Sequence, residues 1–123
     1  MFKVLAINSH SKAYKLCWHL NQNLGLNFEK TDNQKINEDL SFTRYKSEDS
    51  DGNILNLLSN RSKKGYMIPS QKSVNYFLII NKETWKIKKN ELLSKLREIN
   101  EILLLFELEL EKEKNSDRFV IND

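Results

Sequence analysis

The stretch that most constrains the fold of this chain is an apolar run that follows its single proline, Pro69. The run contains Val74, Tyr76, Phe77, Leu78, Ile79 and Ile80. Such a series of β-branched and aromatic side chains is typical of a strand that is buried on both faces. Because proline has a fixed φ and no backbone N–H, Pro69 marks a boundary between this strand and Tyr66-Met67-Ile68. We therefore expect this strand at the heart of the fold.

Composition bounds the class of protein. The 123 residues fit one domain whose core needs no metal or disulfide. Cys17 is the only cysteine, which excludes an internal disulfide and suits a reducing cytoplasm. The N-terminal apolar run ends at Asn8, too soon for a signal peptide or a membrane span. The 20 Lys and Arg exceed the 17 Asp and Glu by a net charge of +3, which is mild for a dedicated nucleic-acid binder. We predict a soluble cytoplasmic protein with no membrane partner.

The first third of the chain predicts a strand and then a helix. Residues 2–7 form a short, mostly apolar run, as a strand would. Apolar side chains then recur at three- and four-residue steps: Ala13, Leu16, Cys17, Leu20 and Leu24. We expect Ser9 or Ser11 to cap this helix at its start and Gly25 to end it. Tyr14 and Trp18 lie four residues apart, so they are expected to stack at the edge of the core.

The remaining pattern predicts further strands and a second helix. Alternation around residues 26–28 and 40–45 indicates half-exposed strands, and a polar turn at 47–52 precedes an apolar strand at 54–58. After the central strand, residues 81–86 read as a connection. Leu92, Leu93, Leu96 and Ile99 then indicate a helix. Residues 102–111 indicate a last strand, and this strand and the tail after it place Glu107, Glu109, Glu111 and Glu113 on one side if the chain stays extended.

These elements predict one α+β domain over residues 1–111, followed by a polar tail over 112–123. The expected order is β-α-β-β-β-β-α-β. The sheet would be mixed but mostly antiparallel, with about five to six strands and two helices packed on one face. The closing β-α-β unit is predicted to be a right-handed parallel crossover. The tail either frays or docks through Phe119-Val120-Ile121, and the open sheet leaves edges that invite partners.

The proline segment also carries a family motif. Ile68-Pro69-Ser70-Gln71-Lys72-Ser73-Val74-Asn75-Tyr76-Phe77 resembles the signature of the IPExxxVDY family, small bacterial proteins of the Bacteroidota. Residues 14–21 resemble the first-helix motif of that family, and residues 59–66 resemble its pre-proline loop. Ser70 and Asn75 stand where the family has Glu and Asp, and each difference removes a carboxylate. The resemblance implies a cytoplasmic housekeeping protein and no particular reaction.

Metal and catalytic chemistry find little support in the sequence. Cys17 and His19 point about 200° apart on a helix, so they cannot share a metal ion. A cysteine on an apolar helix face packs rather than reacts. The acidic turn at 47–52 has Leu58 where a calcium loop needs glutamate, and the scattered glycines form no phosphate loop. His10 follows the first strand, where α/β enzymes present catalytic groups, but a capping or surface role is the simpler interpretation. We predict no metal, no cofactor and no enzymatic activity.

Two regions combine cations with aromatic side chains. The first is Arg61, Lys63, Lys64 and Lys72, which flank Tyr66, and the second is Lys86, Lys88 and Lys89 with Trp85. Cations interleaved with exposed aromatic rings are what single-stranded nucleic acid requires. A solvated surface is the simpler interpretation of both regions. In the same way, Asn60 and Ser62 are expected to satisfy turn backbone while Arg61 clamps the loop to an acidic neighbour.

Two functions follow from these observations. The preferred hypothesis is a non-enzymatic adaptor that binds a protein partner, or self-associates as a homodimer, through a sheet edge or the surface of Tyr14, Trp18 and Tyr66. The alternative is an RNA-associated accessory protein that uses the basic loop 60–72. The residues expected at any binding site are Trp18, Asn60, Arg61 and Tyr66.

Overall fold

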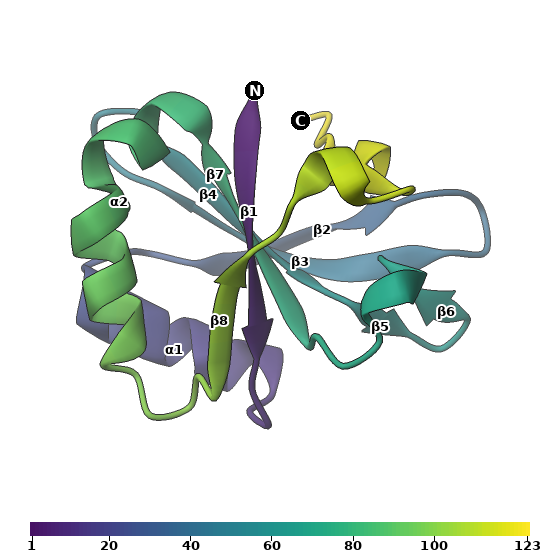
Figure 1. The fold of residues 1–123 in the computed structure, drawn as a ribbon, viewed down its shortest axis with the longest axis horizontal. Helices are drawn as coiled ribbons and strands as arrows, with labels where there is room; N and C mark the ends of the chain where they lie inside the picture. Colours follow the sequence, from purple (N-terminus) through teal and green to yellow (C-terminus); the bar gives the residue numbers. More distant parts are fainter.

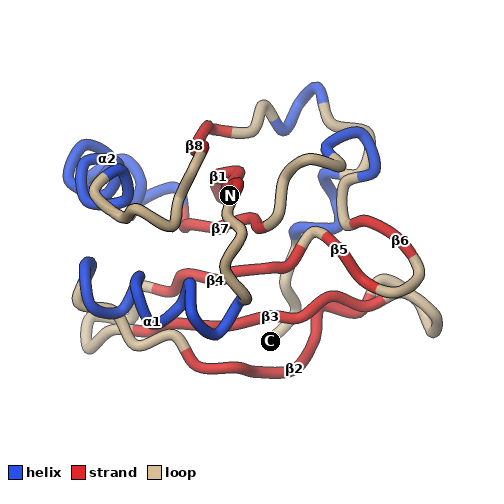
Figure 2. Tube along the Cα trace, turned by 90° about the horizontal axis from the view of Figure 1, so that it is seen from below, coloured by secondary structure: helices blue, strands red, loops and turns tan.

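A six-stranded sheet forms the centre of the computed structural model, which describes residues 1–123 (Figure 1). Its strands are β1 (Phe2–Asn8), β2 (Glu29–Lys35), β3 (Ser41–Glu48), β4 (Ile54–Ser59), β7 (Tyr76–Asn81) and β8 (Leu104–Glu107). Figure 2 shows them stacked in the order β2-β3-β4-β7-β1-β8, with β8 at the top. Together with helices α1 (Ala13–Leu24) and α2 (Lys82–Arg97), they confirm the predicted α+β class and the order of the elements.

The apolar run after Pro69 is the central strand β7, as predicted. It pairs with β4 on one side and β1 on the other, and its residues 76–80 are buried. Every neighbouring pair in the sheet is antiparallel, so the sheet is not mixed. Because β7 and β8 both run antiparallel to β1, they are parallel to each other with β1 between them. The predicted parallel crossover is therefore split by the first strand of the chain.

Both helices cover one face of the sheet, as predicted (Figure 1). Helix α1 contributes Leu16, Cys17 and Leu20 to this core, and α2 contributes Trp85, Leu92 and Leu96. Burial of these apolar stripes against the strands is the main source of stability for both helices.

The helix boundaries differ in part from prediction. Gly25 ends α1 in the left-handed conformation, at φ 64°, which glycine adopts without steric cost. At its start, α1 follows Lys12 with no side-chain cap, because the Ser9 hydroxyl accepts from the Ser11 N–H instead. Helix α2 begins at Lys82, earlier than predicted, because the Asn81 side chain caps it by accepting from the Glu83 N–H. The segment predicted as a connection is thus the first turn of α2.

The opposite face of the sheet is covered without any α-helix. A second core of Val4, Phe42, Leu58, Phe77 and their neighbours is closed by Met67, Ile68, Val74, Leu108 and Phe119. The covering segments include three short 3-10 helices: η1 (Pro69–Gln71), η2 (Leu110–Lys112) and η3 (Ser116–Phe119). Figure 2 shows them on the side of the sheet away from α1 and α2.

Residues 112–123, predicted as a polar tail, dock on this second face. Phe119 is buried, and its ring centroid lies 5.0 Å from that of Phe77. The Arg118 guanidinium donates to the carbonyls of Tyr66 and Met67. At the end of the segment, hydrogen bonds from the buried Arg44 and then from Lys46 lower the pKa of Asp123 to about 2. Of the two alternatives for this segment, docking is the one observed.

The last strand is shorter than predicted. β8 ends at Glu107 and the chain then turns through η2, so the four glutamates do not line one side of a strand. Glu107 lies 3.4 Å from the Lys3 ammonium, whereas the Glu113 carboxylate accepts from Ser70 and Gln71 in η1. Neither helix has the length and apolar character to span a lipid bilayer.

Candidate functional site

An open groove of about 650 Å³ lies at the end of the sheet where β1 and β4 end and β7 begins. Tyr76 at the start of β7 is paired with both Ile7 and Ser59, so these strand ends are neighbours. Three segments form the walls: residues 9–12 after β1, the small hairpin of β5 (Arg61–Ser62) and β6 (Gly65–Tyr66), and residues 72–76. We call this hollow the basic groove.

The charge of the basic groove is uncompensated. Four cationic side chains line it, Lys12, Arg61, Lys63 and Lys72, and no Asp or Glu does. None of the four forms an ion pair, since all seven ion pairs in the molecule involve other residues. His10, hydroxyls and an amide complete the polar lining. Convergent cations in a concave surface attract anions.

Tyr66 holds two of these cations in place. Its hydroxyl accepts from the Arg61 guanidinium at 3.0 Å, and the guanidinium carbon lies 5.5 Å from the ring centroid. The Lys72 ammonium lies 5.8 Å from the same centroid. A cation–π contact orders a cation without neutralising it. The predicted clamp between Arg61 and an acidic neighbour is therefore wrong, because its partner is this tyrosine.

Asn60 lies beneath the groove and not on its surface. It is fully buried, and its Nδ2 donates to the carbonyls of Gln71 and Val74 at 2.8 Å while its Oδ1 accepts from the Ile68 N–H at 2.9 Å. Its own backbone pairs with Asn75 and Met67. The binding role predicted for Asn60 does not fit this burial. The Asn60 side chain instead satisfies three backbone groups of residues 67–75, which we call the proline loop. The predicted role was to satisfy its own turn; the observed role extends to this neighbouring loop.

The wall formed by residues 9–12 is tied to β7. The Ser9 N–H donates to Asn75 Oδ1 at 2.8 Å, and the Tyr76 hydroxyl donates to the Ser11 carbonyl. Burial, the largest cause, raises the pKa of Tyr76 to about 12. The phenol therefore stays protonated at neutral pH and keeps its donor role. These bonds hold Lys12 and His10 opposite the hairpin.

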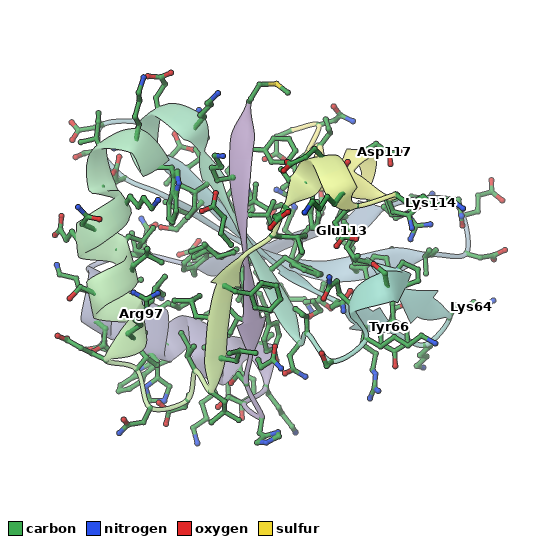
Figure 3. The ribbon with its side chains drawn as sticks, in the orientation of Figure 1. Lys64, Tyr66, Arg97, Glu113, Lys114 and Asp117 are labelled. Atoms are coloured by element: carbon green, nitrogen blue, oxygen red, sulfur yellow. The ribbon has the colours of Figure 1, made fainter.

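Two predicted site residues lie outside the basic groove. Trp18 is on the outer side of α1 with 58% of its surface exposed, and its ring meets His19 edge-on at 5.0 Å between centroids rather than stacking on Tyr14. Lys64 turns away from the groove, and its ammonium lies 3.8 Å from the Asp39 carboxylate. Figure 3 shows Lys64 at the outer tip of the hairpin, beyond Tyr66.

The second basic cluster, Lys86, Lys88 and Lys89 on α2, lacks an exposed ring. Trp85 is buried at 5% exposure, and Lys89 covers it with its ammonium 5.6 Å from the ring centroid. The predicted pairing of cations with an exposed aromatic ring is therefore wrong for this cluster. We call these three residues the α2 lysines.

The nucleophile and metal candidates do not meet in the groove. Burial raises the pKa of the Cys17 thiol to about 12, which suits the predicted packing role. His10 lines the groove, but no carboxylate faces it there. No group of three or more His, Cys, Asp or Glu side chains is arranged to hold a metal ion. What the groove offers is charge, hydroxyls and amides for binding.

No protein-family model, curated protein or solved structure matches this chain. Sequence reasoning selected Arg61, Lys63, Lys72 and Tyr66 correctly as neighbours but missed Lys12, Ser9 and Asn75. The only available signal was the position of His10 directly after the first strand. The missing information was the antiparallel pairing of β1 with β7, which brings that loop to the proline segment.

Proposed function

We propose that this protein is a non-enzymatic RNA-binding accessory protein that holds single-stranded RNA in the basic groove. The observation that carries the proposal is the convergence of Lys12, Arg61, Lys63 and Lys72 with no carboxylate and no ion-pair partner. A phosphate backbone supplies successive negative charges, and lysine and arginine contacts to it release counterions. Of the basic residues predicted to bind RNA, Arg61, Lys63 and Lys72 line this one groove and Lys64 does not.

Hydroxyl and amide groups favour RNA over a simple anion. Ser11, Ser62 and Asn75 line the same groove as the cations, and such groups bind sugar hydroxyls, phosphates and base edges. Because the net charge of the chain is only +3, the attraction is local to the groove and should be highly sensitive to salt.

The test is fluorescence anisotropy with a labelled single-stranded RNA of mixed sequence at low ionic strength. We expect binding that weakens as salt is added, and a loss of about tenfold in affinity for the double variant R61A/K72A. The matched control is K86A/K89A, which removes the same charge from the α2 lysines and should cost less than about twofold. Absence of salt-sensitive RNA binding by the unmodified protein would sink the proposal. Tighter binding of an acidic peptide than of RNA would point instead to a protein ligand.

A protein partner at the edge strand β8 is the second candidate. β8 pairs only with β1, and Leu103 and Leu104 beside its free edge are 58% and 53% exposed. The other edge strand, β2, is polar and has an irregularity between Thr31 and Gln34, features that discourage pairing. A partner strand, or the β8 of a second copy, could add to this edge. Light scattering of the protein and of Leu104→Lys decides the homodimer: a dimer that the variant abolishes supports it, and a monomer at all concentrations refutes it.

Membership of the IPExxxVDY family and a cytoplasmic location also belong to the proposal. The motif residues Ile68, Val74, Tyr76 and Phe77 are buried, so they account for the fold of the segment. Asn75 accepts a hydrogen bond from the Ser9 N–H that an aspartate could accept equally. The buried free thiol of Cys17 is compatible with a reducing compartment.

A further inference from the structure

We infer that the RNA site extends from the basic groove along α1, where bases of the same strand stack on Tyr14 and Trp18. This inference rests on the proposed function. A second hollow of about 440 Å³ adjoins the groove, and His10, Ser11 and Lys12 line both. A strand that leaves the groove over these three residues therefore arrives directly at Tyr14.

The two aromatic side chains on this path are largely exposed to solvent. Tyr14 is 65% exposed and Trp18 is 58% exposed, whereas the other tryptophan, Trp85, is buried. Residues four apart lie on the same side of a helix, about 6 Å along its axis. The perpendicular contact with His19 fixes the orientation of the Trp18 ring while leaving most of the residue free. Two exposed rings one helical turn apart offer a stacking surface for consecutive bases.

Charge along the path favours nucleic acid as the occupant. Lys12 and Lys15 line the second hollow beside Tyr14. The only acid there is Glu101, whose carboxylate lies 3.4 Å from His19 Nε2. An apolar protein surface would match Tyr14, Trp18 and Leu103 but would leave the lysines without a partner. A single strand provides both aromatic bases and phosphates, so it matches the rings and the cations together.

The experiment uses the intrinsic fluorescence of the whole protein, since Trp18 is the exposed tryptophan and Trp85 is shielded. The ligands are unlabelled uridine oligonucleotides of about 4 and 12 nucleotides, together with an abasic strand of the longer length. We expect the longer oligonucleotide to quench the fluorescence and to bind more tightly than the short one. The abasic strand should bind without quenching. Trp18→Leu should weaken binding of the long oligonucleotide by about fivefold or more and leave the short one unchanged.

The matched control is Ile87→Ala, which removes an exposed apolar side chain from α2 and should alter neither affinity. Tyr14→Leu provides a second variant with the same expected length-dependent loss. RNA binding that depends on Arg61 and Lys72 but ignores both Trp18 and Tyr14 would overturn the extension and leave the proposed function standing. No RNA binding at all would overturn both. Self-association that Trp18→Leu abolishes, with RNA binding unchanged, would assign this surface to a second copy and refute the extension.

Discussion

The basic groove and the α2 lysines have nearly the same ingredients in the sequence but very different surroundings in the fold. The groove gathers cations from three separate segments around Tyr66, and no acid lines it. The α2 lysines project from one convex helix, with Trp85 buried beneath Lys89. Nearby, Lys88 shares its surroundings with Asp49 and Glu91, and Lys95 pairs with Glu91 at 3.0 Å. None of the three α2 lysines forms an ion pair either, so the two regions differ mainly in geometry: the groove cations converge in a hollow with no acid, whereas the α2 lysines diverge from a helix surface and only Lys88 has acids beside it.

The two regions also differ in what supports them. The groove depends on a buried polar residue, Asn60, that holds the proline loop by five hydrogen bonds from its side chain and backbone. The α2 lysines depend only on the helix that carries them. Substitutions at the groove are therefore expected to change stability or RNA affinity, whereas substitutions of the α2 lysines are expected to change neither.

The largest expected effect is on stability. Asn60→Ala leaves the N–H of Ile68 and the carbonyl of Val74 without partners and removes one of the two hydrogen bonds to the Gln71 carbonyl, so we expect a loss of about 2–4 kcal/mol in the free energy of unfolding. Urea denaturation followed by circular dichroism measures it. Lys86→Ala, on the exposed face of α2, should stay within about 0.5 kcal/mol of the unmodified protein. An equally small effect for Asn60→Ala would mean that the loop does not need this residue.

A smaller effect is expected from Tyr66, which positions Arg61 and Lys72. Tyr66→Leu removes the ring and should weaken RNA binding by about three- to fivefold, the range of an exposed cation–π contact. Tyr66→Phe keeps the ring and loses only the hydrogen bond to Arg61, so its affinity should fall by less than about twofold. Anisotropy titrations compare the two variants. If the phenylalanine variant is as weak as the leucine one, the hydroxyl and not the ring organises the cations.

The smallest effect distinguishes two adjacent lysines. Lys63 lines the groove, whereas Lys64 faces Asp39, so K63A should weaken RNA binding by about two- to threefold and K64A should not. K63A should also reduce the magnitude of the slope of log affinity against log salt by about one, as expected for the loss of one phosphate contact. Equal slopes for the two variants would show that the groove is not the boundary of the site.

The sequence predicted the fold better than the site, for identifiable physical reasons. The buried run that became β7, the apolar stripe of α1 and the left-handed Gly25 are local signals, and each was confirmed. The start of α2 was missed because a polar cap and Thr84 precede its apolar stripe. Predicting the groove would have required the pairing register of β1 with β7, which no local sequence pattern specifies. Likewise, Asn60 reads as a turn residue in the sequence, and only tertiary contacts reveal that it is the buried support of the loop.

Binding of single-stranded RNA in the basic groove is tested most directly by a nuclear magnetic resonance titration of the ¹⁵N-labelled protein with single-stranded RNA at low salt. We expect amide shifts concentrated at residues 9–12, 61–66 and 72–76, the three walls of the basic groove, with residues 82–97 of α2 unaffected. Shifts of equal size along α2, or no shifts at the groove walls, would contradict binding in the groove.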